Sequence, residues 1–286
     1  MLLSRADTVE HEKKGTMDKV TFDKFRELVY EKSGISLSDK KQSLVRSRIA
    51  KRMRELGIDC YRAYLKHVKN DKTGRELVRL LDVISTNVTS FFREEQHFDL
   101  IGQLMREWVD AGQRRFRFWS AACSTGEEPY SLAMTLLDTV DGRRDVDMKI
   151  LATDLSTRVL DKCRKASYSE EKLKNVPRAF KQRYFDIHHN GNDDISCEVK
   201  TVARNLVIFR RLNLSTPPFP MRGPLDIVLC RNVMIYFDTT VRKRLLADIH
   251  RLLKPGGYLM VGHSESLNGL VDNFKPVKPS VYIKCN

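Results

Sequence analysis

The segment 119–131 constrains the fold more than any other part of the chain, because it predicts a strand, a tight loop and a helix in immediate succession. An apolar run ends at Trp119, small residues with a single glycine, Gly126, follow, and 129–137 has helical apolar spacing. Small residues let a ligand approach the backbone closely, and the start of a helix offers unpaired N–H donors. This arrangement is typical of the first unit of a nucleotide-type α/β fold.

Two carboxylates, Glu127 and Glu128, stand where a phosphate-binding loop would place its ligand. A loop that binds an anion would not carry two negative charges there. The glycine-rich G-x-G-x-x-G fingerprint is also absent, so neither a dinucleotide-binding dehydrogenase nor a P-loop enzyme is supported. A cationic ligand rich in hydroxyl and ammonium donors fits better, and S-adenosylmethionine (SAM) is such a ligand.

Strand-like and helix-like segments alternate from residue 91 onward, which predicts an α/β fold with a mostly parallel sheet covered on both faces. A polar, irregular stretch at about 167–206 interrupts the alternation and predicts an inserted antiparallel β-subdomain, with a strand-like segment at 195–202. A Pro-Gly-Gly turn is expected to join the last helix to the strand that follows it. The expected strands are 115–121, 148–153, 206–209, 225–230, 258–261 and 281–284, and the expected helices are 98–111, 129–140, 157–165 and 239–253.

The first third of the chain has a different pattern. We expect a disordered tail at residues 1–16 and a small helical domain at residues 17–86. Residues 87–97 are expected to form a linker that folds over a ligand as a lid. The remainder, 98–286, is the α/β domain with its insertion. No run of about 18 apolar residues occurs, which argues against a spanning helix. The six cysteines fit neither a zinc site nor a disulfide framework, so we expect reduced thiols and no metal.

The net charge of +14 predicts attraction to an acidic partner. The predicted helix 38–56 concentrates this charge, since no acidic residue occurs between Lys40 and Glu55. A solvated helix face normally interleaves both signs of charge, so we favour a docking surface over a merely solvated face. The candidate docking residues are Arg46, Arg48, Lys51, Arg52 and Arg54.

Four polar side chains follow two predicted strands at their carboxyl ends, where open α/β sheets bind ligands. Asp154 ends the second strand and could accept hydrogen bonds from ribose hydroxyls, or could cap the next helix. Arg231, Asn232 and Tyr236 follow the strand 225–230 and are expected to face cofactor or substrate. Arg231 could instead form a structural salt bridge, and Tyr236 could be a core aromatic residue. The Asp/Asn-Pro-Pro-Tyr pattern of amino-methyltransferases does not occur.

Six sequence blocks carry a resemblance to a known family: Asn87-Val-Thr-Ser-Phe-Phe-Arg-Glu94, 119–131, Ala152-Thr-Asp154, Leu212-Asn-Leu214, Cys230-Arg-Asn-Val-Met-Ile-Tyr-Phe237 and Lys254-Pro-Gly-Gly257. Together they closely resemble the chemotaxis receptor glutamate methyltransferases of the CheR family, which are class I SAM-dependent methyltransferases with a Rossmann-like sheet. The resemblance covers about residues 17–286. It implies an all-α N-terminal domain, a SAM-binding domain and a small β-subdomain.

By that resemblance, two residues, Arg93 and Tyr236, would lie beside the transferred methyl group. The residues that would contact SAM are Asn87, Thr89, Arg93, Glu127, Asp154, Asn213, Leu214, Arg231 and Asn232. The implied reaction gives a glutamate methyl ester and S-adenosylhomocysteine, and the implied partners are acidic helical segments of methyl-accepting chemotaxis receptors. We expect a cytoplasmic enzyme that meets the membrane only through its receptor and binds no nucleic acid. A nucleic-acid methyltransferase and a non-catalytic SAM-binding signalling module remain as alternatives.

Overall fold

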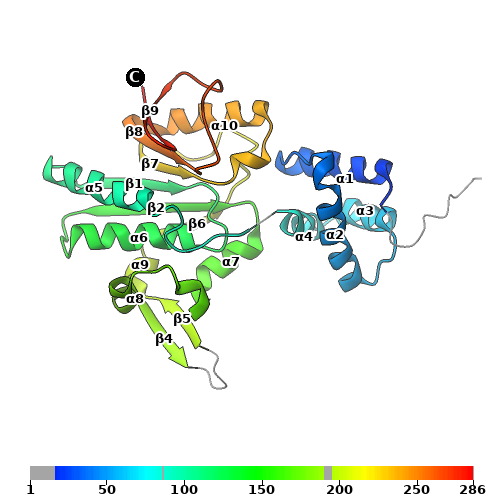
Figure 1. The fold of residues 1–286 in the computed structure, drawn as a ribbon, viewed down its shortest axis with the longest axis horizontal. Coiled ribbons are helices and arrows are strands. Elements are labelled where there is room, and N and C mark those ends of the chain that lie inside the picture. Colours follow the sequence, from blue (N-terminus) through cyan, green and yellow to red (C-terminus); the bar gives the residue numbers. More distant parts are fainter. Residues whose placement is uncertain (1–16, 86, 190–194, 286) are drawn as a thin grey trace, which may run out of the picture. The chain divides into compact units, whose positions relative to one another are not determined.

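The computed structural model describes residues 17–85, 87–189 and 195–285 (Figure 1). The expectations for the tail 1–16, for residue 86 and for residues 190–194 of the insertion therefore lie outside the described residues. The chain divides into two compact units near residue 86. The first is a helical unit, and the second, from residue 87 onward with the short segment 33–35, is here called the sheet unit.

The helical unit is built from amphipathic helices that bury one apolar stripe each. On α2 the buried residues Val45, Ile49 and Met53 recur at helical spacing, and Gly57 ends the helix with a φ of +67°. The expected helix at 38–56 is shorter than predicted, because residues 39–41 form a separate 3₁₀ turn. The elements are α1 (Lys19–Ser33), η1 (Asp39–Lys41), α2 (Gln42–Leu56), α3 (Tyr61–Asn70) and α4 (Arg75–Ile84).

The sheet unit contains a seven-stranded sheet in the order β6-β2-β1-β7-β8-β10-β9. The pairs β6–β2, β2–β1, β1–β7 and β7–β8 are parallel, whereas β10 runs antiparallel to β8 and β9. The strand order reverses between β1 and β7, and open α/β sheets bind ligands at such a switch point. The strands are β1 (Arg115–Ser120), β2 (Asp147–Asp154), β6 (Val207–Arg211), β7 (Leu225–Cys230), β8 (Leu253–Val261), β9 (Phe274–Lys278) and β10 (Val281–Lys284).

Alternating side chains of the central strands supply two packed faces. Phe116 and Phe118 of β1 belong to the main apolar core, which also contains buried residues of α5 and α6. Trp119 points to the other face and packs edge-on against Phe219, with 5.5 Å between the ring centroids. The α5–α6 layer and α10 are visible on the ribbon in Figure 1. The helices are α5 (Gln96–Asp110), α6 (Glu127–Val140), α7 (Thr157–Lys165) and α10 (Thr239–Leu252).

Two details of the sheet differ from the prediction. The Pro-Gly-Gly segment does not form a separate turn, because β8 already begins at Leu253 and the register with β7 shifts between Leu225 and Ile227. The segment is thus an irregularity within the strand, where Gly256 takes a φ of +69°. The sequence analysis also missed β9, whose exposed residues carry little apolar alternation.

The insertion forms a second, three-stranded antiparallel sheet in the order β3-β5-β4, which confirms the predicted β-subdomain. Its last strand is shorter than expected, since β5 stops at Val199 and residues from Thr201 turn into a short helix. The elements are β3 (Ser167–Ser169), η2 (Glu170–Leu173), α8 (Arg178–Tyr184), β4 (Phe185–His189), β5 (Ile195–Val199) and α9 (Thr201–Arg204). Within the described residues, we find no helix that is both long and apolar enough to span a bilayer.

Candidate functional site

The loop between β1 and α6 lies across the carboxyl end of the sheet. The N–H group of Cys123 donates to the carbonyl oxygen of Thr153 near the end of β2, at 2.9 Å. Gly126 takes a φ of +100° at the start of α6. A Cβ at this position would lie 2.7 Å from the hydroxyl of Tyr168 in β3. Both observations require glycine, so the loop is held tightly between the sheet and the β-subdomain.

Asp154, expected on the ribose, ends β2 and faces this loop. Its Oδ2 accepts a hydrogen bond from the Ser124 N–H (2.9 Å), and its Oδ1 accepts one from the Ser156 N–H (3.0 Å). The alternative expectation, that Asp154 caps the next helix, is wrong. The N-cap of α7 is Ser156, whose side chain accepts from the Val159 N–H. The carboxylate of Asp154 thus lies beside the loop 121–126 between β1 and α6, which we call the ligand-approach loop.

The two carboxylates at the start of α6 have different partners. Glu127 is fully buried, accepts a hydrogen bond from the Thr125 hydroxyl (2.6 Å) and pairs with the Lys172 ammonium (3.2 Å). Glu128 instead accepts from the Ser120 hydroxyl (2.7 Å). Burial raises the pKa of Glu128 above its ordinary value. Negative charge in a first helical turn also suits the helix dipole. The pair therefore serves two separate parts of the site.

Lys172 is a site residue that the sequence analysis missed. It lies in η2 of the β-subdomain, and its ammonium also approaches the carbonyl oxygen of Thr89 at 3.5 Å. One lysine thereby joins the predicted lid segment to Glu127. It stands among other polar residues of the insertion, and nothing in its local pattern singles it out. Only the folding of the β-subdomain against α6 brings it to the site.

Arg231 is the centre of a buried ion-pair network at the end of β7. Its side chain is 1% exposed and pairs with Glu94 and Glu128, each at 3.0 Å. It also donates to the carbonyl oxygen of Arg93, and its guanidinium lies over the Phe98 ring, 5.6 Å from the centroid. These contacts favour the structural salt bridge that the sequence left open for this side chain. Arg231 thus ties the segment around residues 93–94 to the sheet.

Asn232 adopts a left-handed conformation, with a φ of +56°. The carboxylate of Glu265 accepts hydrogen bonds from the N–H groups of Asn232 (2.7 Å), Ile235 (3.2 Å) and Gly262 (2.7 Å). A Cβ at Gly262 would lie 2.3 Å from the Asn232 amide nitrogen, so glycine is required there. Glu265 was not predicted, yet this buried carboxylate sets the backbone on which Asn232 and the 3₁₀ turn η3 (Met234–Tyr236) lie.

The other predicted cofactor residues surround the same loop. The Ser124 hydroxyl donates to the carbonyl oxygen of Asn87 at 3.3 Å. The chain leaves β6 beside Asp154, because the Leu212 N–H donates to the Asp154 carbonyl oxygen at 3.0 Å. That contact brings Asn213 and the buried Leu214 to the site. Arg93 is half-buried and donates to the carbonyl oxygen of Val88 at 3.0 Å, and Tyr236 is half-buried at the end of η3.

Glu94, His97 and His263 form a further cluster whose possible ligand atoms lie within 4.8 Å of one another. Burial raises the pKa of Glu94, but the Arg231 charge and hydrogen bonds from His263 N–H and Asn232 outweigh it and hold that pKa below the ordinary range. Burial, reinforced by the Arg231 charge, lowers the pKa of His97 to about 4. The Glu94 carboxylate, the negatively charged member of this cluster, already pairs with the Arg231 guanidinium. This pairing favours arginine over a metal cation as the positive charge that Glu94 binds.

His97 gives the sheet unit an expected pH dependence. A histidine with a pKa of about 4 when folded and about 6.5 when unfolded binds its proton only on unfolding between these values, so stability falls as pH falls from 6.5 towards 4. At pH 5 this amounts to about 2 kcal/mol relative to pH 7.5. Urea denaturation followed by tryptophan fluorescence reports on this unit, since both tryptophans, Trp108 and Trp119, lie in it.

The matched comparison is His97→Gln, which cannot be protonated. Its free energy of unfolding should change about 2 kcal/mol less between pH 7.5 and pH 5 than that of the wild type. Equal pH dependence of the two proteins would show that His97 is not the buried titrating group.

The candidate docking residues of α2 divide into two groups. Arg52 pairs with Glu76 (2.7 Å) and Glu55 (2.9 Å), and Arg48 donates to the carbonyl oxygen of Ile84 at 2.5 Å. These two side chains are engaged within the helical unit, which favours a structural role for them. The remaining three are exposed and form no side-chain hydrogen bond or ion pair with any part of the chain that the structure describes: Arg46, Lys51 and Arg54.

Comparisons with known proteins place this geometry in context. The family model described as "CheR methyltransferase, SAM binding domain" matches residues 87–283, and "CheR methyltransferase, all-alpha domain" matches residues 21–85. A chemotaxis protein methyltransferase of Escherichia coli is 39% identical over 264 residues, covering 91% of this chain and 89% of that protein. One from Pseudomonas aeruginosa is 39% identical (91% of each chain), and one from Borreliella burgdorferi is 36% identical (90% and 91%).

Proposed function

The chain belongs to the CheR methyltransferase family, and from that premise we propose that it transfers the methyl group of SAM to glutamate side chains of chemotaxis receptors. It is a SAM-dependent methyltransferase of chemotaxis. The proposal concerns the acceptor: a side-chain carboxylate, converted to a methyl ester, with S-adenosylhomocysteine as the other product.

One observation carries the choice of acceptor. Arg93 lies in the segment that Arg231 holds against the end of β7, yet its own guanidinium makes a single hydrogen bond, to the Val88 carbonyl oxygen, among the described residues. The remaining donors of a guanidinium suit a carboxylate, which they can orient through two parallel hydrogen bonds. Arg93 would thus orient the acceptor, and Tyr236, from the neighbouring turn η3, would lie beside it.

The chemistry of a carboxylate acceptor also fits the groups present. Glutamate has an ordinary pKa of about 4.3, so the acceptor is already ionised near neutral pH and needs no general base. The buried His97 has a pKa of about 4 and stays neutral near pH 7. Its Nδ1 lies 3.6 Å from the Glu94 carboxylate, and its side chain is too deeply buried to act as a base on the acceptor. The enzyme's task is then to align the acceptor oxygen with the methyl group, which is a matter of positioning.

The residues present fit SAM, which supplies an electrophilic methyl group when bound. The small-residue loop and Gly126 allow close approach to the backbone, and Asp154 offers a carboxylate at the end of β2 for ribose hydroxyls. Glu127 would bind an ammonium or hydroxyl donor, a role in which it now holds the Lys172 ammonium. The pocket walls would be completed by Asn87, Thr89, Asn213, Leu214 and Asn232. Arg231 would stabilise this region through its ion pairs with Glu94 and Glu128.

The acceptor is tested with tritiated methyl-SAM and receptor-containing membranes. We expect label in the receptor that mild base releases as volatile methanol, because methyl esters hydrolyse under those conditions while methylated nitrogen does not. Label that withstands base, or label that appears only in added RNA or DNA, would contradict a glutamate acceptor.

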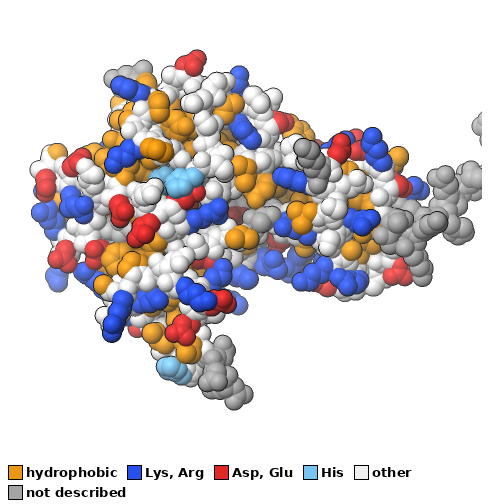
Figure 2. All heavy atoms as spheres, viewed as in Figure 1, with side chains coloured by type: hydrophobic (Ala, Val, Ile, Leu, Met, Phe, Trp, Pro, Cys, Tyr) orange, Lys and Arg blue, Asp and Glu red, His pale blue; other side chains and the backbone are white. Residues whose placement is uncertain are grey.

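A nucleic-acid acceptor receives less support from the charge distribution. Over much of the sheet unit on the face drawn in Figure 2, Lys and Arg side chains lie among Asp and Glu side chains and not in one long basic groove. Proteins that track a phosphate backbone usually present such a groove, and their binding depends steeply on salt. The local excess of positive charge on α2 suits an acidic protein segment better. A receptor partner also implies a cytoplasmic location for this enzyme.

We expect the three exposed basic residues of α2 to bind the acidic surface of the receptor. Replacing Arg46, Lys51 and Arg54 together by glutamate should raise the KM for receptor at least tenfold, because like charges would then oppose an acidic helical partner. Affinity for S-adenosylhomocysteine, measured by isothermal titration, should not change.

The control makes the same charge change at other exposed lysines of the helical unit, Lys24, Lys66 and Lys72. A docking role requires that this control keep a nearly normal KM. If both triple variants lose receptor methylation equally, overall charge rather than the α2 surface attracts the receptor.

A further inference from the structure

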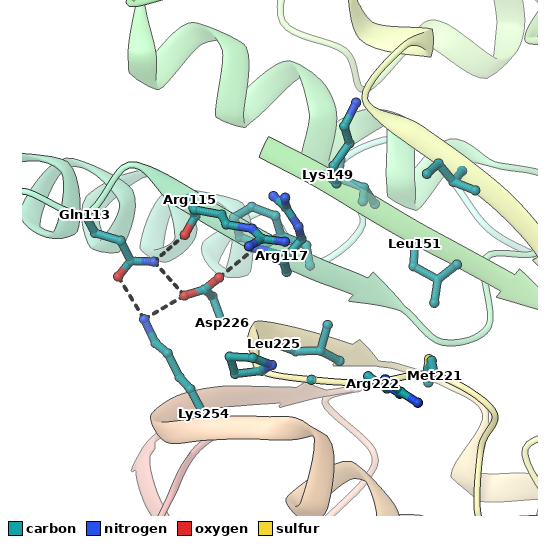
Figure 3. A pocket seen from close by; sticks show the side chains of 15 residues that line it. Gln113, Arg115, Arg117, Lys149, Leu151, Met221, Arg222, Leu225, Asp226 and Lys254 are labelled. Atoms are coloured by element: carbon teal, nitrogen blue, oxygen red, sulfur yellow. Dashed lines mark hydrogen bonds and ion pairs between the residues drawn. The ribbon is translucent and has the colours of Figure 1, made fainter. Parts of the chain in front are cut away.

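A cleft of about 550 Å³ opens at the amino ends of the parallel strands, the end of the sheet opposite to the candidate SAM residues (Figure 3). Its floor includes Leu151 of β2 and Ile208 of β6, which are paired neighbours in the sheet. One wall is the segment 221–225 that leads into β7. The volume lies within the range of about 300–1,000 Å³ that small-molecule sites occupy.

The cleft exists because one face of the sheet lacks a helix there. Parallel sheets are normally covered by crossover helices on both faces. The connection from β6 to β7, residues 212–224, contains no helix and carries prolines at 217, 218, 220 and 224 instead. Ile208 is therefore 41% exposed on a strand that would otherwise be covered. An uncovered apolar sheet face of this kind can bind the apolar part of a ligand.

The walls of the cleft are held in place by hydrogen bonds to a buried carboxylate, that of Asp226. At its inner end, Asp226 accepts hydrogen bonds from the Arg117 N–H (2.6 Å) and the Gln113 amide (2.7 Å), and pairs with Lys254 (2.6 Å). Figure 3 shows this group as the dashed network beside Leu225. A ligand would therefore meet a preformed site and need not order it.

The proline-containing wall is anchored to α10. The Phe219 N–H donates to the Asp248 carboxylate at 2.7 Å. A Cβ at Gly223 would lie 2.3 Å from the Leu252 carbonyl oxygen, so the backbone there touches the end of the helix. Because both contacts fix the loop to a long helix, the cleft keeps its width without a ligand.

The rim of the cleft is positively charged. Arg115 is 77% exposed at its side chain, and its nearest acidic atom, on Asp147, is 4.0 Å away. That carboxylate is already bound to Arg117 at 2.5 Å. The side chains of Lys149 and Arg222 are exposed and form no hydrogen bond or ion pair with the rest of the described chain, although the charge of Lys149 helps to lower the pKa of Asp147. In Figure 3 these two side chains come from opposite sides of the cleft, β2 and the 221–225 wall.

We propose that this cleft binds a small organic anion with an apolar or aromatic body. The body would lie on Leu151 and Ile208, and a phosphate, sulfonate or carboxylate group would be bound by Arg115, Lys149 and Arg222. Long basic side chains around an apolar floor supply both interactions such a molecule needs. Since the cleft and the candidate SAM residues lie at opposite ends of the strands, both ligands can bind at once.

The test uses the full chain saturated with S-adenosylhomocysteine, so that the cofactor pocket is blocked. The probe is 1-anilinonaphthalene-8-sulfonate, an aromatic anion, and its comparison is N-phenyl-1-naphthylamine, which has the same ring system without the charge. We expect one saturable site for the sulfonate and at least tenfold weaker binding of the uncharged compound. The double variant Lys149→Glu/Arg222→Glu should bind the sulfonate at least tenfold more weakly.

The matched control, Lys162→Glu/Lys243→Glu, makes the same charge change at exposed positions on α7 and α10 and should bind the probe normally. Equal binding of the charged and uncharged probes, or an equal effect of both double variants, overturns the proposal, as does the lack of saturable binding. Titration of S-adenosylhomocysteine on the same samples reports separately on the methyltransferase site, so failure of one proposal does not imply failure of the other.

Discussion

Arg231→Met is expected to lower the free energy of unfolding of the sheet unit by about 3–5 kcal/mol, the usual cost of removing one partner from a buried ion pair. The guanidinium is 1% exposed and lies between Glu94 and Glu128. Methionine fills a similar volume but leaves two carboxylates close together without a positive charge. Urea denaturation followed by tryptophan fluorescence measures the loss.

The loss should shrink when the pH is lowered from 8 to 5. A carboxyl group whose pKa is raised in the folded state binds a proton on folding, so the cost of keeping it buried falls as the pH falls. Burial already raises the pKa of Glu128, and loss of Arg231 raises it further. Adding Glu94→Gln and Glu128→Gln to the variant should restore part of the stability.

Arg210→Met is the matched control, because the Arg210 side chain is exposed and its one hydrogen bond among the described residues goes to the neighbouring Phe209 carbonyl oxygen. Its effect should stay below about 0.5 kcal/mol, as for most surface changes. A comparably small loss for Arg231→Met would mean that the network contributes little and that this arginine is available for the cofactor instead.

Asp154→Asn is expected to raise the dissociation constant of S-adenosylhomocysteine at least about tenfold, or about 1.4 kcal/mol. The carboxylate ends β2 and holds the backbone of the ligand-approach loop at Ser124 while lying where ribose hydroxyls would bind. Asparagine keeps the shape and one acceptor oxygen but loses the charge that strengthens hydrogen bonds from hydroxyls. Isothermal titration of wild type and variant measures the change.

Asp161→Asn serves as the control, since Asp161 is an exposed residue of α7 that pairs with Arg164 at 2.8 Å. It removes the same charge from the same region and should leave product affinity unchanged. Binding that is unaffected by Asp154→Asn, or equally weakened by the control, would place the ribose elsewhere.

Much of the architecture followed from local patterns. The strand Leu225–Cys230 and the helix Thr157–Lys165 have the bounds that apolar periodicity and stop signals predicted. Periodicity works in these cases because a single face of each element is buried or the strand is buried on both faces. It failed for β9, whose side chains are mostly exposed, and for the Pro-Gly-Gly segment, where pairing with β7 extends β8 through a bulge.

The candidate site was predicted unevenly for a similar reason. Asp154 and the 119–131 loop stood out because strand ends and loop residues are adjacent in the sequence. Lys172 and Glu265 did not, although one pairs with Glu127 and the other holds the backbone of Asn232. Each reaches the site from a distant segment, so no local pattern marks it.

The sequence by itself determined the alternation of strands and helices, the small-residue loop that follows β1 and the carboxylate that ends β2, because these depend on neighbours within a few residues. Only the tertiary structure decided how the charges are shared. It buried Arg231 between Glu94 and Glu128, paired Arg52 with Glu76, and gave the Arg93 guanidinium a single hydrogen bond among the described residues. Ion pairs depend on distance in space, and residues 94, 128 and 231 meet only when the sheet has formed.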